Sequence, residues 1–369
     1  MHRFFFTTKD AFINSGSDAI TGEDFLDKNT GQDEILELKK VFFDRAFHYP
    51  TRILLQFDTD EIKNFISSSV LGRGIDKDPS YKTNLRLWET QGTSGLSETY
   101  TIAAYPVSES WDEGVGKESD RPKTTDGVSW KYRQNKASVQ NTWATAGGSY
   151  IAGDEVTQSF SAESPDINMD ITTITKKWFS GTNNNYGLLL RFSGSAETST
   201  GSFEDLKFFS RQTNTIYSPK IELKWDDHLP ATGSNTGSLT ALDLSGTVEN
   251  YLYPIHVREA YKENEKVKFR FGTRKRYINK SFTTSVQTVS GSYFAEGSAS
   301  YSIIDMATNE TMVPFSAYTS MSCDTTSPYF MQDLNGFEPN RAYKILIKVN
   351  HNDGQKIIYD DDFEFILRV

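Results

Sequence analysis

Acidic side chains are the residues of this chain whose type and spacing come closest to a chemical site. They occur in pairs at Asp112-Glu113 and Asp226-Asp227, and in a triplet from Asp360 to Asp362. Two carboxyl groups facing each other across a sugar can hydrolyse a glycosidic bond, and loop carboxylates joined by asparagine oxygens can bind calcium. Adjacent acidic residues in loops are usually just solvated. We therefore expect no catalytic residue, no metal site and no cofactor. A structural calcium ion held by loop Asp and Asn oxygens is the alternative.

Two other patterns that often mark an active site are incomplete here. The segment from Gly114 to Ser119 looks like a phosphate loop, but a Walker motif needs glycine at the position of Trp111 and Ser or Thr where Glu118 stands. The histidines have no metal-binding spacing, so they predict no metal site. These histidines are His2, His48, His228, His256 and His351.

Tryptophan rings could bind a sugar by stacking on it. Trp130 and Trp143 lie in a long irregular segment, from Val107 to Tyr150, that is rich in Gly, Ser, Thr and charged residues. Long loops of this kind are either functional or held in place by their own aromatic residues. Trp130 and Trp143 are therefore the candidate glycan-binding residues, and packing within the loop is the competing interpretation.

One basic run stands out, from Lys266 to Arg276. Strand alternation places Val267, Phe269 and Phe271 on the face opposite to the cations. A solvated strand face is the default interpretation, and docking onto an acidic neighbouring subunit is the sharper hypothesis. The candidate partner-binding residues are Lys266, Lys268, Arg270, Arg274 and Arg276.

Composition narrows the class of protein. The chain has 369 residues and a formal net charge of −10, which disfavours binding to the phosphates of nucleic acid. Its single cysteine, Cys323, excludes an intrachain disulfide. Phe, Tyr, Trp, Ser and Thr are abundant, and long helical-period runs are absent, so the composition predicts an all-β protein. We see neither a signal peptide nor an apolar run long enough for a membrane span, so we expect synthesis in a cytosol and no membrane contact.

The elements that would position these residues are mostly strands. Helices are predicted from Asp60 towards Val70, capped by Thr59 or Asp60 and stopped by Gly72 and Gly74, and over Thr172 to Phe179. Strands are predicted at 4–8, 34–39, 52–57, 83–89, 99–106, 186–190, 205–209, 219–225, 251–258, 266–272, 299–306, 343–349 and 357–369.

A flexible linker is predicted from residue 227 to 247, because Thr232 to Ser238 is a run of small polar residues and glycine. It would separate a domain at 1–226 from a smaller Ig-like β-sandwich at 248–369. Limited proteolysis of the purified protein should then cut first between Asp226 and Thr247 and leave two resistant fragments. A first cut elsewhere would contradict the linker.

Five segments in fixed order resemble the DNRLRE family of carbohydrate-binding-module-like jelly rolls. The family's usual Thr-Trp-x-x-x-Pro is degraded to Arg121-Pro122 here. The resemblance implies a jelly-roll β-sandwich over residues 1–226, with Trp88, Trp111 and Trp178 in its core and a sugar-binding ancestry. The segments are Thr51-Arg-Ile-Leu-Leu-Gln-Phe-Asp58, Asn84-Leu-Arg-Leu-Trp88, Ser110-Trp-Asp-Glu113, Asp170-Ile-Thr-Thr-Ile-Thr-Lys-Lys-Trp-Phe-Ser-Gly181 and Tyr186-Gly-Leu-Leu-Leu-Arg191.

The second half is similar to terminal domains of structural proteins from T4-like phages of marine bacteria, through Val313-Pro-Phe315, Ser322-Cys-Asp324 and Arg341-Ala-Tyr-Lys-Ile-Leu346. Together the two resemblances imply a non-enzymatic component of a tailed-phage virion, in the neck, tail, baseplate or a fibre-like decoration. Its expected partners are other virion proteins and further copies of itself in a symmetric assembly. The alternative is an adhesion module that binds host-surface glycans.

Overall fold

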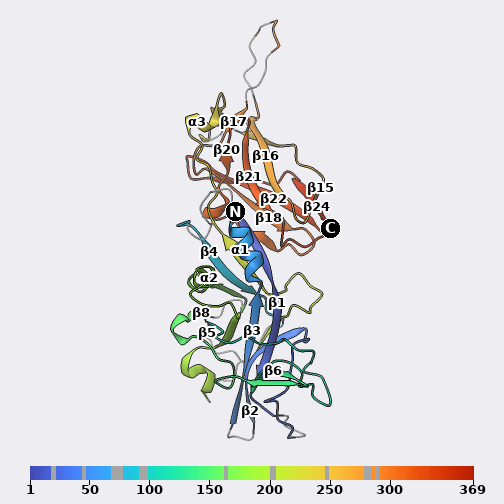
Figure 1. The fold of residues 1–369 in the computed structure, drawn as a ribbon. Coiled ribbons are helices and arrows are strands. Elements are labelled where there is room, and N and C mark those ends of the chain that lie inside the picture. Colours follow the sequence, from blue (N-terminus) through green and yellow to red (C-terminus); the bar gives the residue numbers. More distant parts are fainter. Residues whose placement is uncertain are drawn as a thin grey trace. The chain divides into compact units, whose positions relative to one another are not determined.

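The computed structural model describes residues 1–369 except 18–21, 44–46, 68–77, 91–98, 162–164, 200–204, 246–248, 278–281, 283 and 287–290. The chain folds into two compact units (Figure 1). Unit 1 contains Met1–Phe4 and Lys224–Val369, and unit 2 contains Phe5–Leu223. In both units strands far outnumber helices, so the predicted all-β class is confirmed. The division at residues 226 and 248 stays a prediction.

Unit 2 is built on a curled sheet with the strand order β8-β5-β10-β3-β1-β12-β4-β9, to which β2 and β11 add beside β3. Its central strands are apolar because both faces are covered: Leu189 on β10 lies opposite Leu54 on β3 and Tyr105 on β5. The strands are β1 (His2–Asn14), β2 (Ile35–Phe43), β3 (Phe47–Phe57), β4 (Lys82–Leu87), β5 (Thr99–Pro106), β6 (Tyr132–Lys136), β7 (Val139–Thr142), β8 (Val156–Ser161), β9 (Ile167–Asp170), β10 (Leu188–Phe192), β11 (Asp205–Phe209) and β12 (Lys220–Lys224).

Two short helices of unit 2 lie where the sequence predicts them, α1 (Thr59–Ser67) and α2 (Thr172–Phe179). The predicted cap of α1 is wrong by one residue. Asp58, the residue after β3, accepts the backbone N–H groups of Asp60 and Glu61 at 2.8 and 3.1 Å, which satisfies two of the unpaired donors of the first turn. The predicted stops at Gly72 and Gly74 lie outside the described residues. Two 3-10 helices, η2 (Ala152–Asp154) and η3 (Gly194–Thr198), complete the unit.

The long segment from Val107 to Tyr150 is an ordered loop around the β6–β7 hairpin. Trp111 and Trp143 are buried with Val128 and Leu189 in one apolar cluster, against which Trp130 packs. The segment is thus held in place by its own aromatic residues, the second of the two interpretations of such a loop.

Unit 1 contains two packed sheets, in the orders β13-β17-β16-β21-β20, with β14 beside β16, and β15-β24-β22-β18-β19, with β23 beside β22. Its helices are α3 (Gly233–Thr236) and the 3-10 helix η4 (Ala317–Thr319). The strands are β13 (Thr240–Ala241), β14 (Asn250–Ile255), β15 (Ala260–Lys262), β16 (Lys266–Lys275), β17 (Ser292–Tyr293), β18 (Ala299–Asp305), β19 (Thr311–Val313), β20 (Ser322–Cys323), β21 (Pro328–Asp333), β22 (Ala342–Asn350), β23 (Lys356–Tyr359) and β24 (Glu364–Arg368).

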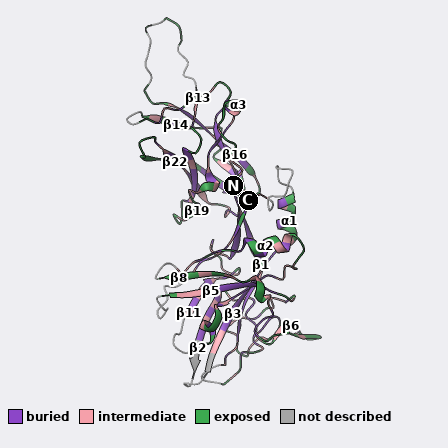
Figure 2. Cartoon of the chain, turned by 90° about the vertical axis from the view of Figure 1, so that its left-hand side faces the viewer, coloured by how far each residue is buried: buried purple, intermediate pink, exposed green. Residues whose placement is uncertain are grey.

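Alternation along the strands builds the core of unit 1, which can be followed in Figure 2. On β22 every second residue from Tyr343 to Val349 is buried, and on β16 the residues Val267, Phe269 and Phe271 are buried as predicted. The two sheets meet through aromatic rings, and the rings of Tyr301 on β18 and Phe330 on β21 stack with centroids 3.7 Å apart. This core makes unit 1 a β-sandwich.

The first four residues belong to the core of unit 1, which the sequence analysis did not anticipate. Phe4 is buried there, and its ring meets that of Phe337 edge-on at 5.8 Å. The amide of Gln332 donates to the carbonyl of His2 at 3.0 Å, and Arg3 pairs with Asp333 at 2.6 Å. The chain therefore begins in unit 1, forms unit 2, and returns to unit 1 at Lys224.

The predicted linker also contains packed structure. It includes α3 and β13, and Leu242 and Leu244 are buried in the core of unit 1. A protease that cuts first in this segment is therefore expected to cut before Leu242. Within the described part of the chain, no helix has the length and apolar character needed to span a membrane.

Phe4→Ala should destabilise unit 1 selectively, by roughly 3–5 kcal/mol, because it leaves a cavity in an aromatic core. Hydrogen exchange read by mass spectrometry should show faster exchange in β16 and β22. Phe5→Ala is the matched control: Phe5 is equally buried, but it packs against Phe65 in unit 2. Equal effects of both variants on both units would contradict the assignment of the first four residues.

Candidate functional site

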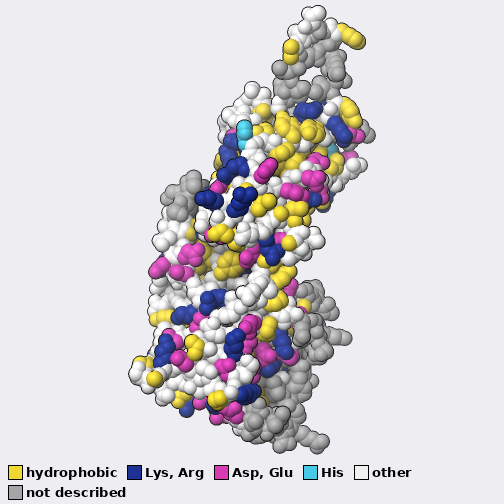
Figure 3. Space-filling model, turned by 90° about the vertical axis from the view of Figure 1, so that its right-hand side faces the viewer, with side chains coloured by type: hydrophobic (Ala, Val, Ile, Leu, Met, Phe, Trp, Pro, Cys, Tyr) yellow, Lys and Arg dark blue, Asp and Glu magenta, His cyan; other side chains and the backbone are white. Residues whose placement is uncertain are grey.

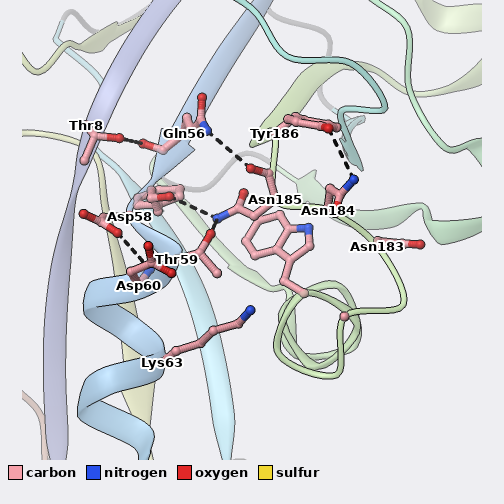
Figure 4. A pocket seen from close by; sticks show the side chains of 13 residues that line it. Thr8, Gln56, Asp58, Thr59, Asp60, Lys63, Asn183, Asn184, Asn185 and Tyr186 are labelled. Atoms are coloured by element: carbon pink, nitrogen blue, oxygen red, sulfur yellow. Dashed lines mark hydrogen bonds between the residues drawn. The ribbon is translucent and has the colours of Figure 1, made fainter.

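The candidate site is a polar cavity of about 570 Å³ in unit 2. It lies where β3 ends and α1 begins, facing the turn that follows α2 (Figure 4). A volume of this size is in the range of small-molecule pockets. The cavity is lined by Thr8, Gln56, Phe57, Asp58, Thr59, Asp60, Lys63, Trp178, Gly181, Asn183, Asn184, Asn185 and Tyr186.

Asn185 fixes the wall between the turn and α1. Its amide nitrogen donates to the carbonyl of Phe57 at 3.0 Å and to the hydroxyl of Thr59 at 2.7 Å. Its amide oxygen accepts the backbone N–H of Gly187 at 2.9 Å. With these hydrogen bonds made, the side chain holds the turn against the start of α1, as Figure 4 shows.

The other two asparagines are fixed through their nitrogens, which leaves their amide oxygens available. The nitrogen of Asn183 donates to Asp154 at 2.8 Å, and that of Asn184 donates to the hydroxyl of Tyr186 at 3.2 Å. Gly181, which ends α2 with a φ of +75°, allows the chain to turn into this run. The turn therefore places amide groups in the wall of the cavity.

Helix α1 contributes charge. Asp60 and Lys63 are exposed side chains one turn apart, and within the described residues neither forms an ion pair. Asp58 adds a second carboxylate, part of which caps the helix. Two carboxylates and one ammonium give the lining a net charge of −1, which disfavours an anionic occupant.

Trp178 places an indole N–H in the wall of the cavity. Its side chain is 1% exposed, it lines the cavity, and its indole N–H is buried without an acceptor among the described residues. A buried donor left unpaired costs about 1–3 kcal/mol, so such groups are rare and need an explanation. The family resemblance implies a core position for Trp178, and it gives no role to the run Asn183-Asn-Asn185. The run of three amides directly after a helix end was the available signal.

The two predicted glycan-binding tryptophans lie elsewhere in unit 2. Trp143 is 4% exposed, and its indole N–H donates to the carbonyl of Ser129 at 2.9 Å, so its ring faces are covered by the core. Trp130 is partly exposed, and the guanidinium of Arg52 lies 4.8 Å from its ring centroid. Neither residue lines the cavity.

Part of the predicted basic strip on β16 is paired with an acidic side chain of unit 1 itself. Lys268 and Arg270 both pair with Asp324, at 2.9 and 2.6 Å. The hydrogen bond from Arg270 holds the pKa of Asp324 well below its usual range. Two cations of the strip are therefore already paired with an acidic group before any partner arrives.

The remaining cations of the strip are more exposed. Arg276 pairs with Glu249 at 3.4 Å, and the guanidinium of Arg274 lies 4.8 Å from the ring centroid of Tyr251. Lys266 is exposed at the start of β16. Figure 3 shows cations and anions interspersed over the face in view. The docking role of the strip stays a prediction.

The charged residues of the five family-like segments act in the frame of unit 2. Arg52 on β3 donates to both carboxylate oxygens of Glu197, at 2.7 and 3.0 Å, and to the carbonyl of Gly147 at 2.6 Å. Arg191 on β10 shares the same carboxylate at 2.5 Å. Arg86 on β4 pairs with Glu222 on β12 at 3.0 Å. These pairs tie loops and neighbouring strands to the sheet.

Glu113, from the Ser-Trp-Asp-Glu segment, is half-buried and forms a second cluster with the buried Asp10 and the exposed Arg211. It accepts two hydrogen bonds from Arg211, at 2.9 and 3.0 Å, and the backbone N–H of Asp10 at 3.0 Å. Asp10 is 1% exposed; one of its oxygens accepts the N–H of Arg211, and the other has no partner among the described residues. Burial raises the pKa of Asp10 to about 7, and the nearby charge of Glu113 adds to this.

Unit 1 contains a serine, a histidine and a glutamate in line. Ser322 Oγ lies 3.3 Å from His228 Nδ1, and His228 Nε2 lies 2.6 Å from Glu296 Oε1. The hydroxyl of Ser322 is buried and accepts the backbone N–H of Leu229 at 3.0 Å, while Glu296 accepts that of Ala231 at 2.8 Å. A nucleophile needs access to its substrate, so this arrangement is best explained as a fastening of residues 228–231.

No group of three or more His, Cys, Asp and Glu side chains suited to a metal ion occurs in the part of the chain that the structure describes. No protein-family model matches the chain, and no curated protein matches it. The likeness to DNRLRE-type domains is therefore carried by the residues quoted for it.

Asp10 should make the stability of unit 2 depend on pH. Its pKa is about 7 in the folded protein and about 4 when unfolded, so the folded state binds more protons between these values. The free energy of unfolding should therefore fall as pH rises from about 4 to about 7, by up to roughly 4 kcal/mol from this group. Asp10→Asn should remove that decline, as measured by urea titration at several pH values.

Asp154→Asn is the control for this titration. The hydrogen bond from Lys177 lowers the pKa of Asp154, so its contribution is present at neutral pH and is lost as pH falls. The two variants should change the pH profile in opposite directions. Identical profiles for the wild type and Asp10→Asn would contradict the assignment.

Proposed function

We propose that this protein is a non-enzymatic structural component of a tailed-phage particle, present in several copies and acting through contacts with neighbouring subunits. The resemblances of its two halves point to that class. The observation that carries the proposal further is the exposed apolar surface of the sheet that contains β22 and β23 in unit 1.

Ile358 on β23 lies opposite Lys348 on β22, and Ile366 on β24 lies opposite Ala342. Residues paired in this way share a face of the sheet. Lys348 alternates with the buried Ile347 and Val349, so the face of Ile358 is the outer one. Ile358 and Ile366 are 52% and 44% exposed. Hydrophobic side chains lie among charged ones on the upper part of the face that Figure 3 shows.

Exposed isoleucines beside an edge strand favour association with another protein surface or strand. Burial of such a surface on a neighbouring subunit stabilises the contact, and many copies on a symmetric particle would multiply weak contacts. The role proposed is therefore assembly, with the particle as the location and other virion proteins and copies of this chain as partners.

The second candidate, adhesion to a host-surface glycan, is favoured by one observation, the polar cavity of unit 2. Its lining of amides, carboxylates and a buried indole N–H is suited to hydroxyl groups. The two candidates are compatible, because the exposed isoleucines lie in unit 1 and the cavity lies in unit 2.

The double variant Ile358→Asp/Ile366→Asp should fold normally and fail to enter particles, because charge on the contact surface opposes its burial. Particles purified from a host that supplies the variant in trans, in place of the wild type, are analysed by quantitative mass spectrometry. Lys356→Asp on β23 is the control for a charge change on the same strand. Absence of the wild-type protein from purified particles would contradict the proposed function.

A further inference from the structure

We propose that the cavity of unit 2 binds one neutral sugar residue, with the indole N–H of Trp178 donating to a hydroxyl oxygen of the ligand. The inference rests on the glycan-adhesion candidate and gives it a site different from Trp130 and Trp143. The argument starts from the hydrogen-bonding groups that the protein itself leaves unused.

Donors and acceptors are mixed in this cavity. Among the described residues, the donors without a partner are the indole N–H of Trp178 and the ammonium of Lys63, and the acceptors without one include the carboxylate of Asp60 and the amide oxygens of Asn183 and Asn184. A hydroxyl group both donates and accepts a hydrogen bond. A ring that carries several hydroxyls can therefore satisfy both kinds of group at once, whereas an apolar ligand would leave them unpaired.

The charge of the lining favours a neutral ligand over an anionic one. The lining contains Asp58 and Asp60 against the single cation Lys63. A carboxylate or phosphate ligand would meet two negative charges, so a neutral sugar is favoured over an acidic sugar or a nucleotide. A hydroxyl oxygen next to Trp178 also removes the cost of its unpaired donor, and specificity for a hydroxylated ligand follows from that.

The cavity is also organised in advance. Asn185 makes three side-chain hydrogen bonds, Asp58 caps α1, and Gly181 sets the turn, so the walls are held by contacts within the protein. A preorganised wall loses little conformational freedom when a ligand binds. The side chains free to contact a ligand are the ones left unused: Asp60, Lys63, Asn183, Asn184 and the N–H of Trp178.

The test is calorimetric titration of the full chain with the methyl glycosides of glucose, galactose, mannose and N-acetylglucosamine, and with glucuronate as the acidic probe. We expect saturable binding of at least one neutral glycoside and none of glucuronate. Trp178→Phe keeps an aromatic ring but removes the N–H together with the five-membered ring, and it should weaken binding about tenfold, as expected for one hydrogen bond. Asp60→Asn and Lys63→Met should also weaken binding.

Trp130→Phe is the matched control, because it removes an indole N–H outside the cavity and should leave binding unchanged. Thermal unfolding supplies a second readout: Trp178→Phe should lower the melting temperature, because Trp178 is buried and the smaller ring leaves a void, but saturating glycoside should raise the melting temperature of the wild type more than that of the variant. If Trp178→Phe fails to fold, Asp60→Asn, at an exposed position, carries the binding test.

Three results would overturn the proposal: no binding of any neutral glycoside, stronger binding of glucuronate, or loss of binding in Trp130→Ala with normal binding in Trp178→Phe. Binding to insoluble polysaccharide without binding to methyl glycosides would also overturn it, because the site would then need more than one sugar residue. Entry of Trp178→Phe into particles is expected to be normal, so failure of the sugar site and failure of the structural role give different results.

Discussion

A buried guanidinium, that of Arg52, is the constraint on which much of unit 2 depends. It is 8% exposed on a central strand, and arginine cannot lose its charge by deprotonation. The guanidinium can therefore be buried only where other segments supply hydrogen-bond acceptors and a negative charge. Glu197 from η3 and the carbonyl of Gly147 from the long loop are those partners. Removing one side of such a buried pair costs about 3–5 kcal/mol, so the loop and η3 are held to β3 by the need to neutralise one charge.

The same logic explains how a long irregular segment can be ordered. Residues 107–150 have few backbone ladder bonds, yet many of their polar groups are paired. Trp111 packs in the core and donates its N–H to the carbonyl of Tyr186 at 2.8 Å, while Glu113 links Asp10 to Arg211. One unfavourable contribution to stability remains. Asp10 has one carboxylate oxygen without a partner among the described residues, and burial raises its pKa to about 7. Order in this loop is thus obtained by burying polar groups, and the pH at which Asp10 ionises is a consequence of that burial.

The fold class and most strands could be predicted because burial follows the two-residue period, as on β22 and β16. The missed strands show where that signal fails. β8 is polar and mostly exposed, and β21 begins with Pro328, a residue that opposes a central strand. Membership of Phe4 in unit 1 depends on contacts with residues more than 300 positions away, which no local pattern encodes. The cavity was missed for the same reason, because residues that are far apart in the sequence form it: the end of β3, the start of α1 and the turn after α2.

Some residues of the family-like segments also line the cavity, and these can be distinguished from lining residues that the fold does not need. Asp58, Trp178, Gly181 and Tyr186 belong to those segments and also line the cavity. Asp58 is needed to cap α1, and Gly181 has a backbone conformation that favours glycine, so both would be retained even in a domain that binds nothing. A cavity at this place is therefore a consequence of how β3, α1 and α2 join. Under the proposal that the cavity binds a ligand, the choice of ligand depends on residues that the fold does not require, Asp60, Lys63, Asn183 and Asn184.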